Sequence, residues 1–277
     1  MMPKASVAYL GPEGTFAHLV ARKRFGTRYE LVPRHPIREV FDYVRADSSR
    51  LGVVPIENSS GGTIFDTVDC LLEDNGLQVC EALSVDVKLA LMSKERENIR
   101  VIYSHFAPLH HCEAWLDDNY PDAELRETPS TGAALARAAE ETGAAAIGNR
   151  QAGQRYHLRI LEYPLESSVL NQTQFFVVGH RSLVERHATR TSLIVSLPNR
   201  PGSLSDFLLP FKQHGVNLSR IISRPVQGKP SSYIFMIDID GTEKQPQVRT
   251  ALADARRSQA DIRIIGSYPV RKRPYSS

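Results

Sequence analysis

The sequence contains few cysteines, and their spacing fits neither a disulfide framework nor a paired-cysteine metal site. Cys70, Cys80 and Cys112 are the only three in 277 residues, and no two form a CxxC pair. An odd number of widely spaced cysteines argues against a disulfide-rich secreted domain and against a zinc-binding module. We therefore expect reduced thiols and a cytoplasmic location.

Long apolar runs are missing as well. No stretch approaches the ~18 consecutive apolar residues of a membrane-spanning helix, and the first residues, MMPKASV, lack the apolar core of a signal peptide. The net charge is only +3, and the one compact basic run, residues 271–273, predicts a solvated tail and not a nucleic-acid surface. We expect neither a membrane nor a nucleic acid as a partner.

Several common catalytic signatures are also absent. The sequence has no GxSxG nucleophile elbow, no GxGxxG dinucleotide motif and no P-loop. The run His110-His111-Cys112-Glu113 has the residue types of a metal site, but neighbours on a helix point in different directions, and ligands need a spacing of three or four residues. We therefore expect no nucleotide, no metal ion, and no covalent serine or cysteine mechanism.

The chain does contain a regular alternation of predicted strands and helices. Apolar runs at 7–10, 51–54, 101–103 and 144–147 predict strands, and a helix with Thr15 as its N-cap is predicted to follow the first. This order predicts a mainly parallel α/β architecture, in which ligands bind beyond the carboxyl ends of the strands. We expect one or two clefts there, lined by the loops at 11–15, 55–63, 104–107, 129–131 and 148–150.

After residue 191 the pattern changes to strand, helix, two strands, helix and strand. Strands are predicted at 192–197, 216–226, 233–239 and 262–266, helices at 204–211 and 243–257, and a hairpin loop at 227–230. This βαββαβ order is that of a ferredoxin-like unit. The polar, weakly periodic residues 183–191 before it predict a linker.

Polar loops supply the candidate binding residues, and each has a structural alternative. The glycine-rich turn at 11–16 leads into a helix N-terminus, which suits a carboxylate or phosphate, or it is a plain turn capped by Thr15. Asn58 and Ser59 can hydrogen-bond a polar ligand with Glu57 orienting them, or they form a Ser/Thr-rich turn. The stretch NQTQFFVVG at 171–179 runs from four polar side chains directly into a buried strand.

The motifs GPEGTF, VVPIENS, YSH, PST and AAAI stand in the order found in prephenate dehydratases, and the chain resembles that family from residue 5 to residue 270. The later part resembles an ACT domain through PGSL at 201–204 and NLSRIISRP at 217–225. The resemblance implies a two-lobed, periplasmic-binding-protein-like catalytic domain with a cleft between its lobes. That domain spans 1–182, with lobe 1 about 1–82 and 171–182 and lobe 2 about 83–170; the ACT domain spans 192–277.

The resemblance also implies a function. Prephenate dehydratases are hydro-lyases that remove the ring hydroxyl and CO2 from prephenate, giving phenylpyruvate for phenylalanine biosynthesis, with no metal or organic cofactor. The family's threonine-arginine-phenylalanine motif falls on Thr173, Gln174 and Phe175, which implies a catalytic hydrogen bond from Thr173 to the leaving hydroxyl and a cleft wall at Phe175. The implied substrate-binding residues are Thr15, Glu57, Asn58, Ser59, Ser130, Thr131, Lys88 and Arg150.

Gln174 departs from the family pattern because it replaces an arginine. Losing a charge-assisted pair at a partly desolvated site costs ~2–5 kcal/mol of anion binding unless another cation substitutes. Lys88 and Arg150 are the candidates for that cation, with Arg22 on the first helix as a weaker one. Gly61 stands near the place of an acidic residue of the family.

The ACT resemblance implies that phenylalanine binds as an effector and that the chain forms a homodimer or homotetramer through side-by-side ACT domains. Ile222 replaces the glutamate of the usual motif, so inhibition is expected to be weakened or altered. The implied effector-binding residues are Pro201, Gly202, Ser203, Leu204, Asn217, Leu218, Ile222 and Ser223.

Two other functions stay open at this stage. One is a divergent relative that decarboxylates prephenate but keeps the hydroxyl, or that dehydrates arogenate. The other is a non-catalytic, amino-acid-sensing protein that kept the cleft, because a fold does not by itself imply an activity.

Overall fold

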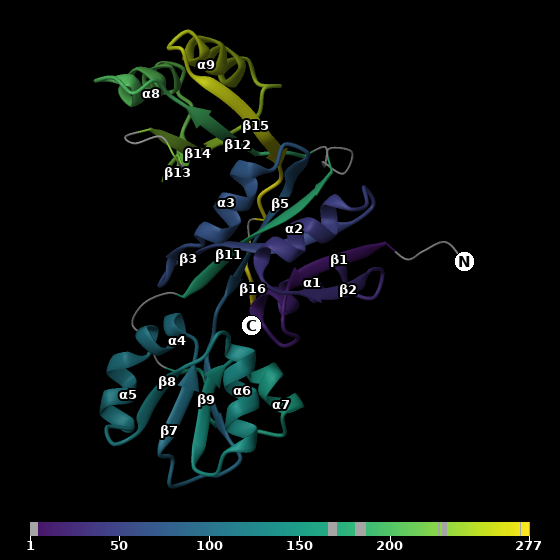
Figure 1. The fold of residues 1–277 in the computed structure, drawn as a ribbon, viewed down its shortest axis with the longest axis vertical. Coiled ribbons are helices and arrows are strands. Elements are labelled where there is room, and N and C mark those ends of the chain that lie inside the picture. The colour runs from purple at the N-terminus through teal and green to yellow at the C-terminus, as the bar shows by residue number, and fades with distance from the viewer. Residues whose placement is uncertain are drawn as a thin grey trace. The chain divides into compact units, whose positions relative to one another are not determined.

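The computed structural model describes residues 5–165, 171–180, 187–226, 228, 232–271 and 273–276, which form three β-sheets with helices packed on them (Figure 1). The chain divides into two compact units. The first comprises Met1–Thr67, Leu83–Phe175 and Arg273–Ser277, and the second comprises Val68–Ala82 and Phe176–Lys272. No helix in these described ranges is long and apolar enough to cross a membrane.

The first sheet has the strand order β16-β5-β11-β3-β1-β2, with β4 paired to β3, and β1 runs parallel to β2 and β3. Its strands are β1 (Ser6–Leu10), β2 (Glu30–Arg34), β3 (Leu51–Asn58), β4 (Gly62–Thr63), β5 (Leu77–Asp86), β11 (Gln172–His180) and β16 (Tyr275–Ser276). The helices α1 (Phe16–Phe25) and α2 (Ile37–Arg45) pack against β1 and β3, and α3 (Phe65–Glu73) follows β4. The boundary between the two units falls inside β5 and β11.

The strand predicted at 51–54 is longer in the structure. It continues as β3 to Asn58, because the short strand β4 folds back and pairs with Glu57 and Asn58. Glu57 and Asn58, which the sequence placed in a loop, therefore belong to a β-ladder between β3 and β4. The predicted N-cap of the first helix is confirmed, since Thr15 has an extended backbone and its hydroxyl accepts the N–H of His18 at 3.3 Å.

The second sheet has the order β10-β6-β9-β7-β8 and is mixed, because β7 runs parallel to β8 and β9 while β6 runs antiparallel to β9 and β10. Its strands are β6 (Ala90–Ser93), β7 (Val101–Ser104), β8 (Glu124–Glu127), β9 (Ala144–Gly148) and β10 (Arg159–Glu162). One face packs against α6 (Thr131–Glu140) and α7 (Arg150–Arg155), and the other against α4 (Phe106–His111) and α5 (Glu113–Asn119) (Figure 1). The prediction of a mainly parallel sheet is therefore wrong for this part of the chain, in which two of the four strand pairings are antiparallel.

Leu109, Cys112 and Leu116 have the i, i+3, i+7 spacing of one helix, but the helix is interrupted there. Cys112 has non-helical dihedrals and separates α4 from α5. All three side chains still pack into one core beneath the sheet, which explains why their spacing resembled that of one helix.

The third sheet, entirely antiparallel, has the order β13-β14-β12-β15 and lies in the second unit. Its elements are β12 (Arg190–Ser196), α8 (Ser203–Gln213), β13 (Leu218–Pro225), β14 (Tyr233–Asp240), α9 (Pro246–Arg256) and β15 (Asp261–Tyr268). Both helices cover the same face, where they bury Phe207, Phe211 and Leu252 against Leu193 and Ile237 (Figure 1). The predicted βαββαβ unit is confirmed, and Pro210 lies inside α8.

Three expectations concern segments that the structure describes only in part. Residues 183–186 of the expected linker lie outside the described residues, and β12 begins at Arg190, inside the predicted linker range. The expected hairpin loop at 227–230 has only Gly228 among the described residues. In the basic run at 271–273, the described residues Arg271 and Arg273 are exposed, and after it β16 pairs in parallel with Val85 and Asp86 of β5.

Candidate active site

A cavity of about 280 Å³ lies in the first unit, where several strands and helices end. It is largely apolar, with hydroxyl, amide and imidazole groups at a few points, as is usual for a small-molecule site. The residues lining it are Leu10, Gly11, Thr15, Phe16, Ala17, His35, Pro55, Asn58, Ile64, Val87, His105, Ala107, Pro108, Pro129, Ser130, Thr131, Asn171, Thr173 and Phe175.

Four of the five loops predicted to surround a cleft contribute to this cavity. Three of them follow β1, β7 and β8, and the fourth contributes Pro55 and Asn58 at the carboxyl end of β3 itself, as the rule about the carboxyl ends of strands requires. The fifth, at 148–150, does not line it. Its Asn149 lies instead at a separate cavity of about 40 Å³ that Thr15, His18 and Arg22 also line.

Asn58 and Thr173 form a tightly constrained polar contact in the cavity of about 280 Å³. The amide oxygen of Asn58 accepts the N–H of Ser60 at 2.9 Å and of Gly61 at 2.7 Å, so the orientation of the amide is defined. Its nitrogen then donates to the Thr173 hydroxyl at 2.8 Å and to the side-chain oxygen of Asn171 at 3.0 Å. Because the Thr173 oxygen accepts here, the hydroxyl hydrogen points away from Asn58.

Three other predicted binding residues line the cavity at helix N-termini. Thr15 caps α1, and its hydroxyl also donates to the carbonyl of Leu10 at 2.9 Å. Ser130 caps α6 by accepting the N–H of Ala133 at 3.1 Å, and Thr131 is the first residue of that helix. Capping a helix and lining a binding site are therefore not alternatives for these loops, because the capping residues themselves form part of the cavity wall.

Glu57 and Ser59 were also predicted to bind substrate, but neither is among the lining residues. Glu57 pairs with Thr63 across the β3–β4 ladder. Ser59 exchanges two bonds with Gln172, since its N–H donates to the Gln172 carbonyl and its hydroxyl accepts the Gln172 N–H, both at 2.9 Å. These contacts fix the turn after β3 to the start of β11.

The residues expected to replace the family's arginine also lie outside the cavity wall. On β11, Thr173 and Phe175 line the cavity, and alternation along the strand turns Gln174 to the other face. Lys88 is exposed in the connection between β5 and β6. The Arg150 guanidinium lies 4.4 Å from the centre of the Tyr163 ring, and no lysine or arginine is among the lining residues named above.

Two histidines and an asparagine on the wall were not singled out from the sequence. His105 ends the loop after β7, which was expected at the cleft, and it caps α4 with Nδ1 accepting the N–H of Ala107 at 3.4 Å. Burial lowers the pKa of His105, with Glu127 opposing the shift, so this imidazole is neutral at neutral pH. His35 follows β2, which had no clear strand pattern, and Asn171 belongs to the quoted polar stretch.

Helix N-termini supply positive potential in place of a cationic side chain. Phe16 and Ala17 form the first turn of α1, and Thr131 begins α6; all three line the cavity. First-turn N–H groups have no partner inside their helix, and together with the helix dipole they favour an anion. Two ten-residue helices thus direct their N-terminal ends at one cavity.

The residues predicted to bind an effector lie in the third sheet and its first helix. Gly202 precedes α8 in the left-handed region, with φ 84°, and provides no side-chain cap. The hydroxyl of Ser203 is buried and, among the described residues, has no hydrogen-bond partner. Asn217 donates to Asp240 at 2.8 Å, and Ile222 and Ser223 lie on the edge strand β13.

The His110–Glu113 run is not arranged as a metal site. His110 Nδ1 lies 3.3 Å from Glu113 Oε2, His111 Nδ1 lies 2.9 Å from the Ser60 hydroxyl, and Cys112 is buried in the core. Within the described part of the chain, no group of three or more His, Cys, Asp or Glu side chains could hold a metal ion.

The fold and the cavity define a two-lobed α/β catalytic domain and a ferredoxin-like domain in one chain. A family model described as prephenate dehydratase matches residues 7–183, and one described as ACT domain matches residues 191–257. The bifunctional chorismate mutase/prephenate dehydratase of Pseudomonas aeruginosa is 36% identical over 95% of this chain and 73% of its own length. That of Aquifex aeolicus is 34% identical over 96% and 74%.

A solved structure is similar over nearly the whole chain. The prephenate dehydratase of Arthrobacter aurescens in complex with L-Phe has a TM-score of 0.84 and 30% identity, over 97% of this chain and 92% of that one. The chain belongs to the prephenate dehydratase family of hydro-lyases, and its C-terminal part is an ACT domain.

Proposed function

We propose that this chain converts prephenate to phenylpyruvate in the cavity beside Thr173. The observation that carries the proposal is the Asn58–Thr173 contact, together with the family assignment. In the reaction the ring C–O bond breaks with its electron pair leaving as hydroxide, and the ring C–carboxylate bond breaks with its pair entering the ring. A proton converts hydroxide to water, so the products are phenylpyruvate, CO2 and water.

Thr173 assists the departure of the hydroxyl. The Asn58 amide donates to its oxygen, so the Thr173 hydrogen is free to face the leaving group. A donor that is itself hydrogen-bonded in this way is polarised and donates more strongly. Because a threonine hydroxyl is a poor acid, Thr173 stabilises the developing hydroxide by a hydrogen bond, and removing one such donor typically costs about 10²–10³ in rate.

The two carboxylates of prephenate are held by the first turns of α1 and α6. Thr15 and Ser130 cap these helices, and Phe16 and Thr131 begin them on the cavity wall. This arrangement supplies a positive potential although Gln174 stands where the family has an arginine. The neutral His105 adds a donor at Nε2, because its Nδ1 already accepts the Ala107 N–H.

The proposal includes the organisation and surroundings of the chain. The catalytic domain spans 1–182 and the ACT domain 192–277. A cytoplasmic location is supported by the three cysteines, which are buried free thiols.

The ACT domain binds phenylalanine near the start of α8 and along β13. The N-terminus of α8 has no side-chain cap, and the buried Ser203 hydroxyl has no hydrogen-bond partner within the described part of the chain; both support binding of a carboxylate there. Ile221, Leu209 and Tyr233 are each about half exposed, and β13 is an edge strand, which supports pairing of two copies. The chain is then a homodimer or homotetramer, a state that light scattering with and without phenylalanine measures.

One experiment separates this function from its alternatives. Purified chain is incubated with prephenate, and the product is identified by mass and ultraviolet spectrum. Phenylpyruvate supports the proposal, a non-aromatic dihydro-hydroxyphenylpyruvate supports a decarboxylase, and unchanged prephenate supports a non-catalytic sensor. The same assay with arogenate gives the ratio of the two activities.

A further inference from the structure

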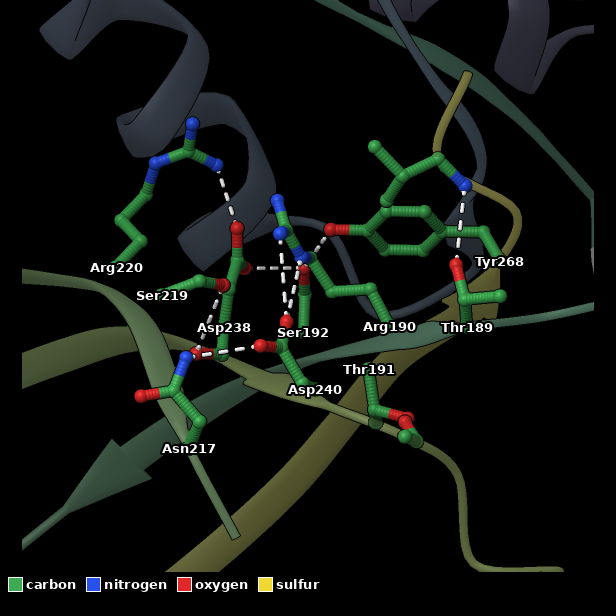
Figure 2. A network of polar contacts seen from close by, with 12 residues as sticks. Thr189, Arg190, Thr191, Ser192, Asn217, Ser219, Arg220, Asp238, Asp240 and Tyr268 are labelled. Atoms are coloured by element: carbon green, nitrogen blue, oxygen red, sulfur yellow. Dashed lines mark hydrogen bonds and ion pairs between the residues drawn. The ribbon is translucent and has the colours of Figure 1, made fainter. Parts of the chain in front are cut away.

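Four polar side chains form one hydrogen-bonded row across the third sheet (Figure 2). Ser192 and Asp238 alternate with Leu193, Ile237 and Ile239, which pack under α8 and α9, so the four side chains lie on the opposite face. They come from four strands: Arg220 on β13, Asp238 on β14, Ser192 on β12 and Tyr268 on β15. The register shifts between Leu218 and Arg220, and this bulge turns Arg220 away from the helix side, where Leu218 packs.

Hydrogen bonds join the row from end to end. The Tyr268 hydroxyl lies 2.6 Å from the Ser192 hydroxyl, Ser192 donates to Asp238 at 2.5 Å, and Arg220 forms an ion pair with the other Asp238 oxygen. With the Ser192 hydrogen on Asp238, the Tyr268 hydroxyl is the donor to Ser192. Burial raises the pKa of Tyr268, so its phenol keeps the hydrogen that this arrangement needs.

Phe176 closes the row into a ring. The Arg220 guanidinium lies 5.4 Å from the centre of the Phe176 ring, and the rings of Phe176 and Tyr268 meet edge to face at 5.6 Å and 64°. We call these five residues, Phe176, Arg220, Asp238, Ser192 and Tyr268, the polar ring. All five belong to the second unit.

Burying the charged and polar groups of the polar ring costs free energy that apolar side chains in the same place would not cost. Asp238, Ser192 and Tyr268 are fully buried, and the Arg220 side chain is 8% exposed. Burial raises the pKa of Asp238, and the Arg220 guanidinium opposes that shift without cancelling it. Replacing a buried ion pair with apolar side chains is often neutral or stabilising, so its best-attested role is to specify one arrangement over others.

The polar ring joins the strand of the proposed effector site to the strand of the catalytic threonine. Arg220 lies on β13, two residues before Ile222. Phe176 lies on β11, directly after Phe175, and alternation along β11 turns Thr173 and Phe175 to the cavity and Phe176 to the ring. A shift of β13 therefore reaches β11 through packed, buried side chains.

We propose that the polar ring transmits the state of the effector site on β13 to Thr173 on β11. The proposal rests on the proposed function, because it requires both phenylalanine binding and prephenate turnover. Its physical content is mechanical coupling: the closed ring makes β11 follow β13 when effector binding displaces Arg220, and a broken ring leaves β11 in its effector-free position.

The test breaks the ring without touching the cavity or the proposed effector residues. Tyr268→Phe removes one hydroxyl, and Phe176→Leu removes the aromatic contact while keeping an apolar side chain. For each, kcat/KM is measured without phenylalanine and at saturating phenylalanine, and calorimetry measures phenylalanine binding. The inhibition ratio is kcat/KM without phenylalanine divided by kcat/KM at saturating phenylalanine. Coupling between two sites commonly changes affinity by a factor of about 5 to 150, so we expect the inhibition ratio of each variant to fall at least about threefold. We expect effector-free kcat/KM to stay within about twofold of the parent.

Matched variants separate coupling from stability. Tyr29→Phe makes the same chemical change at a partly buried position before β2, and Phe41→Leu makes the same change at a fully buried position of α2. Both should keep the parent's inhibition ratio. If Phe176→Leu does not fold, Ser192→Ala breaks the ring at the next bond and carries the same expectation.

The outcomes distinguish this proposal from the function on which it rests. Active, phenylalanine-binding variants with an unchanged inhibition ratio overturn the role of the polar ring and leave the proposed function intact. A parent chain that turns over prephenate but neither binds nor responds to phenylalanine overturns the proposed regulation, and the ring's role with it. Loss of inhibition in the ring variants alone, with phenylalanine still bound, supports the proposal.

Discussion

The side-chain nitrogen of Asn58 lies 2.8 Å from the hydroxyl oxygen of Thr173 and donates to it. Since two backbone N–H groups hold the other end of the amide, this direction cannot reverse without breaking the turn after β3. The Thr173 hydroxyl therefore accepts from Asn58 and cannot donate to it, so its hydrogen is available to a ligand in the cavity.

Thr173→Ala should lower kcat about 10²–10³-fold, because it removes one donor to the leaving hydroxide. Affinity for prephenate should change little, since the carboxylates are held elsewhere. Single-turnover kinetics together with a binding titration measures the two effects separately. Thr173→Ser keeps the hydroxyl and serves as the control; full activity of the alanine variant would exclude this role.

Asn58→Asp should lower kcat as much as Thr173→Ala does. An aspartate has no N–H to donate, and its carboxylate would accept the Thr173 hydrogen and turn it away from the substrate. In the double variant Asn58→Asp/Thr173→Ala the losses should not add, because both remove one interaction. Asn119→Asp, at an exposed position of α5 where the amide donates to Trp115, is the matched surface change.

Thr131→Pro tests whether the first turn of α6 holds a carboxylate. Proline is tolerated at the first helical position, and Ser130 before it has the extended backbone (ψ 159°) that proline requires. The change removes one N–H, so the dissociation constant for prephenate should rise about 10-fold or more, as expected for a bond to a charged group. Thr131→Val removes the hydroxyl but keeps the N–H, and equal weakening by both variants would contradict the proposed role of the helix.

Gln174→Arg should bind prephenate at least as tightly as the parent. The substitution adds a cation on β11 and changes no residue of the cavity wall, so it adds favourable potential for a dianion. A titration at low and at physiological salt measures the affinity. Markedly weaker binding by the arginine variant would indicate that another cation already acts there.

Stability should decline as the pH falls below about 6.5, the ordinary pKa of histidine. Burial lowers the pKa of His18, against an opposing effect of Glu13, and burial also lowers the pKa of His105 and His111. The unfolded chain then binds more protons than the folded one. The contribution of these histidines to the free energy of unfolding is therefore fully present above pH 6.5, and it is lost as the pH falls through their pKa values in the folded protein.

His18 provides the local test of this dependence. Its Nδ1 accepts the N–H of Gly14 at 3.1 Å, a bond that protonation at Nδ1 abolishes. His18→Gln should therefore make the unfolding midpoint less sensitive to pH between 7.5 and 5, compared with the parent.

Local patterns allowed part of the fold to be predicted. The cap at Thr15, the strands of the third sheet and the alternation of β and α elements follow from spacing and capping chemistry. β2, with the sequence ELVPR, was missed because it has neither an apolar run nor clean alternation. The extension of β3 was missed because its pairing partner, β4, is only two residues long.

The sequence likewise indicated some residues that line the cavity and others that do not. Polar loops and strand starts pointed to a ligand, and five of their residues line one cavity in the structure: Thr15, Asn58, Ser130, Thr173 and Phe175. Glu57 and Ser59 stood in the same loop and bond to other segments instead. Sequence spacing cannot tell these cases apart, because it does not contain the direction of a side chain after a turn.

The sequence by itself determined many of the strands and helices and the order of the family's motifs, because these depend on neighbours along the chain. Tertiary structure alone decided which way the Asn58 amide points, that helix N-termini and not Gln174 face the cavity, and that Arg220, Asp238, Ser192, Tyr268 and Phe176 meet. The physical reason is that each of these facts depends on groups many residues apart, which only packing and strand register bring within hydrogen-bonding distance.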